Sequence, residues 1–112
     1  MREPTYFVLV ALLDGPLHGW AIIKAVEEAS DGRVRLPTGT LYAALDRLSG
    51  EGLVELVSEE IVNGRARRRY GLTTAGASAL RAEASRMARA AALVTGRSAH
   101  LGARTRRKAR PA

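Results

Sequence analysis

The stretch from Leu36 to Thr73 constrains the fold of this 112-residue chain more than any other part of the sequence. It contains three leucines at helical spacing, Leu41, Leu45 and Leu48. Thr38 follows a proline and is a suitable N-cap for this helix, because its hydroxyl can accept a hydrogen bond from an unpaired backbone N–H. Gly50 and Gly52 then predict the end of the helix, since glycine adopts the left-handed conformation that closes helices.

Two strands are predicted directly after this helix, Leu53–Val57 and Arg69–Thr73, joined around Asn63-Gly64. An Asn-Gly pair favours the tight turn of a β-hairpin. A helix with a polar outer face next to a basic hairpin offers one element for the major groove of a duplex and one for the backbone or minor groove. The pattern therefore predicts a winged helix-turn-helix, a mostly α fold with a small β-hairpin.

Two further helices are predicted before this stretch, at about Pro4–Leu13 and His18–Ala29. Four apolar residues of the first helix are expected to be buried: Val8, Leu9, Leu12 and Leu13. The second helix is expected to bury a stripe of three: Trp20, Ile23 and Val26. Trp20 is either a core residue or part of a ligand pocket, and burial is the more frequent outcome. Arg33–Leu36 alternates charged and apolar residues, which predicts a short strand.

From Thr74 onward the sequence predicts one long helix. Its apolar stripe consists mainly of small residues: Leu80, Ala84, Met87, Ala91 and Val94. Because such a stripe is too thin to anchor a core but lets another helix approach closely, we interpret it as a helix–helix seam. We expect three regions: a winged helix-turn-helix domain (1–73), a dimerisation helix (74–96) and a basic tail without stable structure (97–112).

The net charge of +7 and the pI of about 11.0 suit a polyanionic partner, either nucleic acid or an anionic membrane. The segment from Arg97 to Ala112 has six Lys or Arg residues and no acidic residue, so most of the excess charge lies in the tail. Nucleotide bias in a GC-rich genome is an alternative source of arginine. We assign to it a large share of the scattered surface arginines and a small share of the clustered ones.

The sequence disfavours a membrane protein and an enzyme. It contains no cysteine, which excludes disulfides and thiolate chemistry. The longest apolar run, Tyr6–Leu13, is too short to span a bilayer, and we expect a cytoplasmic protein. Neither His18 nor His100 has the neighbours of a metal site, and the chain has no Walker-type glycine loop and no Ser-His-Asp set. We therefore expect no cofactor, no metal and no catalytic residues.

The face of the 38–50 helix opposite its leucines is small at the centre and polar at the edges. Its residues are Gly39, Ala43 and Asp46, flanked by Thr40, Tyr42 and Arg47. Small residues let a helix lie deep in a groove, while the polar ones can bond phosphates or base edges. The alternative is an ordinary amphipathic helix with a solvated face. The neighbouring hairpin favours the DNA-binding interpretation.

The hairpin has four arginines after its turn and no acidic residue among them: Arg65, Arg67, Arg68 and Arg69. Alternate residues of a strand point to opposite faces, so Arg67 and Arg69 share one face while Arg68 lies on the other. Arg65, near the tip, can enter a minor groove or hold phosphates. Charges also protect an exposed strand edge from aggregation, but that role does not require four arginines.

Together these motifs resemble the PadR-like family of bacterial transcriptional regulators over about residues 5–95. The matching residues are Leu17-His18-Gly19-Trp20, Gly39-Thr40-Leu41-Tyr42, Leu45, Leu48, Glu51-Gly52-Leu53, Gly64-Arg65, Tyr70, Leu72-Thr73 and Ala75-Gly76. The chain departs from the family pattern at three places. Trp20 stands where tyrosine is usual, Pro37-Thr38 where a Ser-Pro order is common, and Gly71 where a basic or polar residue is usual.

The resemblance implies a repressor that dimerises through its C-terminal helix, packed partly against the partner's N-terminal helix. In the family, repression is often relieved by a small aromatic or drug-like ligand near the dimer interface. The expected partner is double-stranded DNA with a near-palindromic operator, contacted by Lys24, Arg35, Thr38, Thr40, Tyr42, Arg47, Arg65 and Arg67. The expected dimer interface contains Val8, Leu80, Ala84, Met87, Ala91 and Val94, and the expected ligand contact is Trp20.

Two rival functions fit the same features. The first is a general nucleic-acid binder, architectural or RNA-associated, in which the basic tail dominates. Such a protein would bind all duplexes with equal affinity, whereas a specific regulator prefers its own site. The second is a winged-helix interaction module that docks a protein partner, and it would lack salt-sensitive DNA binding.

Overall fold

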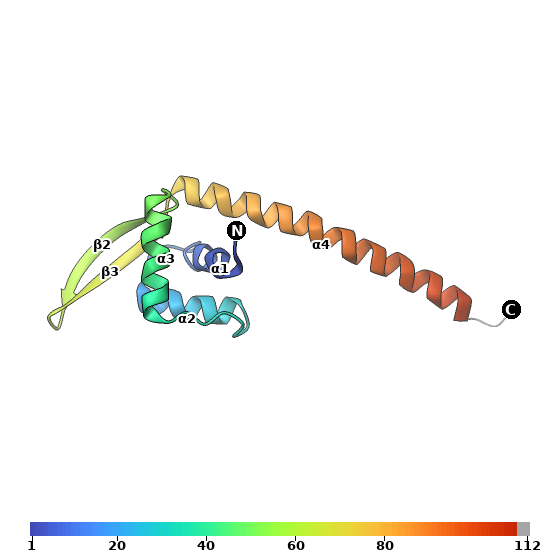
Figure 1. Ribbon diagram of the computed structural model, residues 1–112, viewed down its shortest axis with the longest axis horizontal. Coiled ribbons are helices and arrows are strands. Elements are labelled where there is room, and N and C mark those ends of the chain that lie inside the picture. Colours follow the sequence, from blue (N-terminus) through green and yellow to red (C-terminus); the bar gives the residue numbers. More distant parts are fainter. Residues whose placement is uncertain (110–112) are drawn as a thin grey trace. The chain divides into compact units, whose positions relative to one another are not determined.

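A computed structural model describes the backbone of residues 1–109 and the side chains of residues 1–97. The elements are α1 (Glu3–Ala11), β1 (Leu17–His18), α2 (Gly19–Ala29), α3 (Thr38–Gly50), β2 (Val54–Val62), β3 (Arg65–Leu72) and α4 (Thr74–Ala109). The chain divides into two compact units, Met1–Arg81 and Ala82–Ala112, so α4 begins in the first unit and continues into the second (Figure 1). The predicted class, mostly helical with a small antiparallel hairpin and a long C-terminal helix, is confirmed.

The core of the first unit is formed by apolar side chains from its helices, its sheet and the α2–α3 loop. They are Val8, Leu9, Leu12, Ile22, Val26, Val34, Leu36, Leu41, Leu45, Leu48, Val54, Tyr70 and Leu80. The three leucines of α3 are completely buried, as their spacing predicted. Fully burying one leucine contributes about 1.5–3 kcal/mol, so these side chains determine which face of α3 points outward.

The start of α3 differs from the prediction, while its end agrees. Thr38 is the first helical residue and Pro37 is the N-cap, with no side-chain capping bond, so the predicted Thr38 cap is wrong. The φ of Pro37 is −61°, and its carbonyl accepts the N–H of Leu41 at 3.0 Å, which begins the helix without a hydroxyl. At the other end α3 stops at Gly50, and Gly52 has a left-handed φ of 75°.

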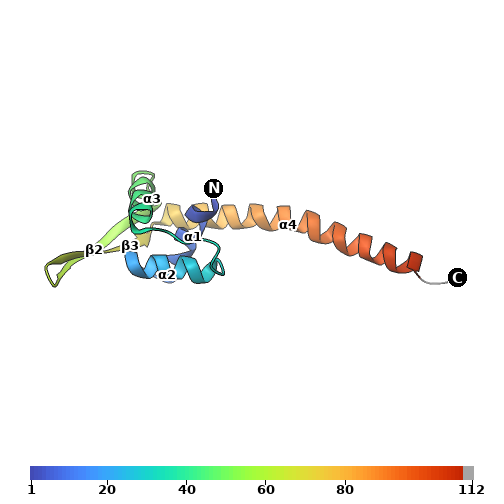
Figure 2. The same ribbon diagram turned by 60° about the horizontal axis from the view of Figure 1, so that its bottom comes forward.

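The sheet is antiparallel, with strand order β1-β3-β2. Asn63 and Gly64 have φ values of 52° and 75°, as a type I′ turn requires. That turn matches the right-handed twist of its strands, which confirms the predicted hairpin. The strands run further than predicted because their pairing continues to the turn, where Val62 faces Arg65. Within the first unit the hairpin projects beyond α1, α2 and α3 in both views (Figures 1 and 2).

The predicted strand at Arg33–Leu36 is wrong. The segment is a loop whose alternation has another cause: Val34 and Leu36 are buried in the core, while Arg33 and Arg35, each of which precedes one of them, are exposed. The two arginines pair with carboxylates, Arg33 with Glu3 at 3.2 Å and Arg35 with Glu27 at 3.5 Å. The third strand of the sheet is β1 instead, where Leu17 pairs with Tyr70 and His18 with Arg69.

Two side chains predicted to be buried are exposed. Leu13 is 55% exposed because α1 ends at Ala11, so Leu13 lies in the following turn. Trp20 is 72% exposed, since α2 buries Gly19 and Ile22 in place of Trp20 and Ile23, together with Val26 as predicted. A shift of one residue turns a helical side chain by about 100°, which places Trp20 at the surface.

α4 continues through Gly96, where the sequence predicted its end, to Ala109. One glycine weakens a helix by about 1 kcal/mol relative to alanine and does not end it where good helix formers follow. The predicted lack of stable structure in the tail stays a prediction, and its last three residues lie outside the described part of the chain. None of the described helices is both long and apolar enough to cross a membrane.

Candidate nucleic-acid interface

The outward face of α3 presents small residues and free hydroxyls. Thr38, Gly39, Thr40, Ala43 and Asp46 are exposed, while the leucines on the opposite face are buried. Within the described residues neither threonine hydroxyl has a hydrogen-bond partner. A Cβ added at Gly39 would meet nothing within 4 Å, so the surface around the start of α3 is open. This shape allows a helix to enter a major groove.

The wing, defined here as β2, β3 and the turn between them, has two unpaired cations. Among the described residues Arg65 and Arg67 have no ion pair and no side-chain hydrogen bond. Arg68 differs, because its Nε lies 3.3 Å from Oε1 of Glu59, and this hydrogen bond and charge raise the pKa of Arg68. Arg69 donates to the carbonyl oxygen of Pro16 at 3.4 Å. Arg65 and Arg67 are therefore the wing arginines free to bind an anion.

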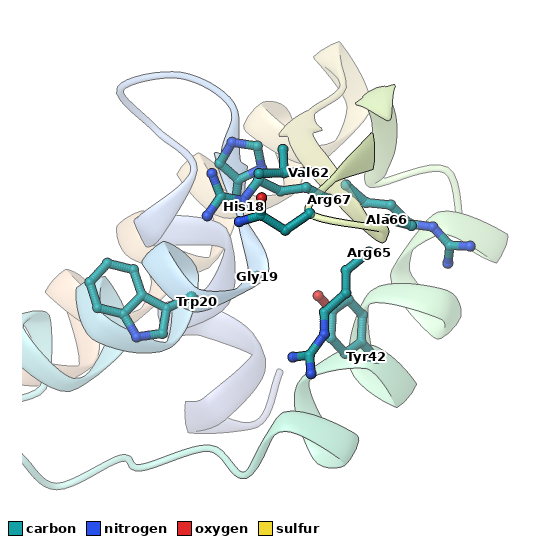
Figure 3. A pocket seen from close by; sticks show the side chains of 10 residues that line it. His18, Gly19, Trp20, Tyr42, Val62, Arg65, Ala66 and Arg67 are labelled. Carbon is teal, nitrogen blue, oxygen red and sulfur yellow. The ribbon is translucent and has the colours of Figure 1, made fainter. Parts of the chain in front are cut away.

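The wing and α3 meet at a cavity of about 550 Å³, which we call the wing cavity. Its lining residues are His18, Gly19, Trp20, Tyr42, Val62, Asn63, Arg65, Ala66, Arg67 and Arg68. In Figure 3 Arg67 lies beside His18, Arg65 reaches toward Tyr42, and Trp20 occupies the opposite edge. Three arginines and no carboxylate line this space, so it attracts anions such as phosphate.

Tyr42 connects α3 to the rest of the first unit. Its ring centroid is 6.5 Å from that of Tyr70, and a Cβ built on Gly19 would lie 2.5 Å from its hydroxyl oxygen. The side chain is half-buried and still lines the wing cavity. The geometry therefore gives Tyr42 a packing role, and its ring also forms part of the surface predicted to contact DNA.

Lys24 lies one helical turn after Trp20, with its Nζ 5.3 Å from the centroid of the indole ring. Such a cation–π contact contributes about 0.5–1 kcal/mol at an exposed site. The contact places one more cation next to the edge of the wing cavity that Trp20 forms. The predicted DNA contact Lys24 and the predicted ligand contact Trp20 thus belong to one surface.

Two other predicted DNA contacts are engaged elsewhere. Arg47 donates to Oγ1 of Thr5 at 2.9 Å and to Oε1 of Glu51 at 3.3 Å. It lines a second cavity, of about 520 Å³, together with the N-terminus of α1. Arg35 is paired with Glu27, as described above. Neither arginine lines the wing cavity, so any contact that they make with DNA lies outside it.

The prediction from sequence missed His18 as part of this surface. Its Nδ1 is buried and has no hydrogen-bond partner among the described residues. His18 lies in a strand of only two residues, Leu17–His18. A strand this short shows no alternation of apolar and polar residues from which the sequence could predict it. Within the described part of the chain no cluster of His, Asp and Glu could hold a metal ion.

Two residues predicted in the dimer interface belong to the protomer's own core. Val8 is 1% exposed and Leu80 is 3% exposed, so neither side chain is available to a second chain. The prediction for these two residues is wrong, because an apolar periodicity marks burial without saying what covers it. The other four residues of the predicted seam are exposed on α4: Ala84, Met87, Ala91 and Val94.

Comparisons with known proteins relate this chain to one family of regulators. The model of the transcriptional regulator PadR-like family matches residues 8–82. The chain is 47% identical over 88 residues to an uncharacterized 37.1 kDa protein in transposon TN4556 of Streptomyces fradiae, covering 79% of this chain and 24% of that protein. It is 46% identical over 69 residues to the transcriptional regulator Rv3488 of Mycobacterium tuberculosis, covering 60% of this chain and 59% of that one. The chain thus spans about a quarter and about three-fifths of these relatives.

Among solved structures, the crystal structure of Bacillus subtilis PadR in complex with operator DNA matches with a TM-score of 0.63. The two chains are 25% identical, and the match covers 71% of this chain and 45% of that one.

Proposed function

We propose that this chain, which belongs to the PadR-like family of transcriptional regulators, binds DNA sequence-specifically as a dimer and represses transcription from a near-palindromic operator. The observation that carries the proposal is the wing cavity. It brings Tyr42 of α3 together with two unpaired wing arginines, Arg65 and Arg67, and has no carboxylate in its lining. The operator complex of Bacillus subtilis PadR supports the same partner for this chain.

In this proposal the first half of α3 enters the major groove. Thr38 and Thr40 have free hydroxyls for base edges or phosphates, and Gly39 leaves room for close approach. Arg65 and Arg67 bind the flanking backbone or the minor groove from the wing. The base contacts select the sequence, while the wing supplies affinity that depends little on sequence.

Dimerisation through the exposed stripe of α4 completes the proposal. Met87 and Val94 are 41% and 65% exposed, and the alanines between them allow a second helix to approach closely. An exposed apolar stripe on a helix is stabilised when a partner covers it. A twofold dimer presents two copies of α3, which calls for two half-sites about one helical turn apart.

We also propose that a small planar ligand relieves repression. The support within the described residues is the space beside Trp20 in the wing cavity. A ligand bound there would occupy the surface that we assign to DNA, so ligand and operator would compete.

Selection of bound sequences from a random duplex pool tests the proposed function. We expect one enriched, near-palindromic sequence, and a substitution of Thr40 by alanine should change that sequence or weaken its enrichment. A control substitution, Arg33→Ala, lies outside the wing cavity and should leave the selected sequence unchanged. Enrichment of no sequence, with strong binding to every duplex, would favour the general nucleic-acid binder. No salt-sensitive binding at all would favour the protein-interaction module.

A further inference from the structure

Trp20 leaves a large apolar side chain exposed on the surface of the first unit. It lies in the first turn of α2 and is 72% exposed. A single exposed apolar side chain is common and needs no function by itself. Trp20, however, lines a cavity that contains three arginines and no carboxylate, and its ring faces a lysine ammonium. On the side of the wing cavity its surroundings therefore favour an anionic partner, whereas on its other side Lys24 lines a hollow with Glu27, Glu28 and Asp31.

The contact with Lys24 determines what this side chain offers. The ammonium lies 5.3 Å from the ring centroid, and the two residues are one turn apart on the same helix. Such a contact favours one arrangement of two long side chains. The indole N–H has no acceptor among the described residues, and this group can only donate. Trp20 and Lys24 thus present a cation, a hydrogen-bond donor and an apolar ring in one place.

The sugar–phosphate backbone of duplex DNA matches this combination. Phosphate oxygens accept hydrogen bonds from an ammonium and from an indole N–H, and the C–H face of a deoxyribose packs against an aromatic ring. Bases in an intact duplex are stacked, so the ring faces the backbone rather than a base. Arg65 and Arg67 line the same cavity and bring further positive charge to the same strand.

We propose that Trp20 and Lys24 form a backbone contact of their own, which fixes the orientation of α2 on the duplex while α3 reads the bases. The proposal rests on the DNA binding proposed above. It assigns Trp20 to the surface that contacts DNA. A ligand bound beside Trp20 therefore acts only by competing with DNA for that surface. Both residues act as positioning residues, so their loss weakens binding to all sequences alike.

Fluorescence tests this directly because Trp20 is the sole tryptophan of the chain. The experiment measures acrylamide quenching of the full-length protein with and without a saturating mixed-sequence duplex, and confirms binding by sedimentation. We expect DNA to lower the quenching constant toward that of a buried tryptophan. An unchanged constant with the duplex bound overturns the Trp20 contact and leaves DNA binding intact. A duplex that does not bind overturns both, and protection by a planar aromatic compound but not by DNA overturns the backbone assignment.

Two substitutions separate the parts of the contact. Trp20→Ala should weaken binding about tenfold for every duplex, the loss typical of truncating an aromatic residue at an interface, without changing the dependence on salt. Lys24→Met removes the charge but keeps an unbranched side chain, and it should flatten the slope of log affinity against log salt by about 0.9. The control is Leu13→Ala, an exposed apolar truncation outside the wing cavity, which should change neither quantity. Equal affinities of the Trp20→Ala and Leu13→Ala variants would overturn the proposal.

Discussion

The hydroxyl of Tyr42 on α3 occupies the space in which a side chain on Gly19 of α2 would begin. A Cβ built on Gly19 would lie 2.5 Å from the hydroxyl oxygen and 3.0 Å from the ring carbon that bears it. Both residues line the wing cavity, so this contact sets the distance between the two helices at the surface assigned to DNA. Gly19 is required here by close approach rather than by an unusual backbone angle.

Gly19→Ala should therefore lower the free energy of unfolding by about 1–3 kcal/mol, the usual cost of overpacking a well-packed contact. Urea denaturation measures this. Adding Tyr42→Phe removes the nearest atom and should restore part of the stability. Gly39→Ala is the matched control, since nothing lies within 4 Å of its added methyl group. A Gly19→Ala variant as stable as the wild type would contradict the tight contact.

Arg65→Ala should weaken DNA binding evenly across sequences, because Arg65 is an unpaired cation of the wing. The slope of log affinity against log salt should flatten by about 0.9 if Arg65 neutralises one phosphate. Fluorescence anisotropy on selected and scrambled duplexes measures both effects. Arg33→Ala, which removes a cation paired with Glu3, is the control and should leave the slope unchanged. Equal slopes for Arg65→Ala and the wild type would remove the wing from the interface.

Ala91→Glu should convert the proposed dimer into a monomer, because it places a charge in the stripe that we assign to the α4 seam. Light scattering at micromolar concentration reports the mass. Ala92→Glu adds the same charge about 100° further around the helix and should remain dimeric. A monomeric wild type, or two variants of equal mass, would argue against this seam.

Truncation after Gly96 should preserve the fold, the dimer and the preferred DNA sequence. It removes six cations and no anion, so the salt dependence should flatten by about one unit for each phosphate that the tail neutralises in the intact protein. The ratio of specific to non-specific affinity should rise, since non-specific binding depends most on charge. Circular dichroism, light scattering and binding at several salt concentrations measure these effects. Loss of the dimer or a changed preferred sequence would show that the tail has a structural or base-reading role.

The elements with strong local signals could be predicted from the sequence. Leu41, Leu45 and Leu48 fix the buried face of α3 by spacing alone, and Asn63-Gly64 fixes the turn of the hairpin because few residue pairs accept a positive φ at both positions. The same turn also predicted that Arg65 and Arg67 are exposed, since residues next to such a turn lie near the tip of the hairpin.

The features that the sequence did not predict depend on contacts between segments that are far apart in the chain. The strand β1 has two residues, and only its hydrogen bonds to β3 define it. Arg33–Leu36 alternates as a strand does, yet it is a loop with two buried side chains. Val8 shows the same limit, because periodicity predicted its burial but could not distinguish its own core from a partner. Trp20 suits both a core and a surface contact, and a shift of one residue in the buried stripe decided between them.

The most direct test of sequence-specific binding is the ratio of two affinities at physiological salt. One duplex has the sequence selected from the random pool, and the other has the same composition in scrambled order. We predict that the full-length protein binds the selected duplex at least about a thousandfold more tightly, as specific regulators do. A ratio near one would contradict base reading by α3 and leave a protein that binds DNA only through its charge.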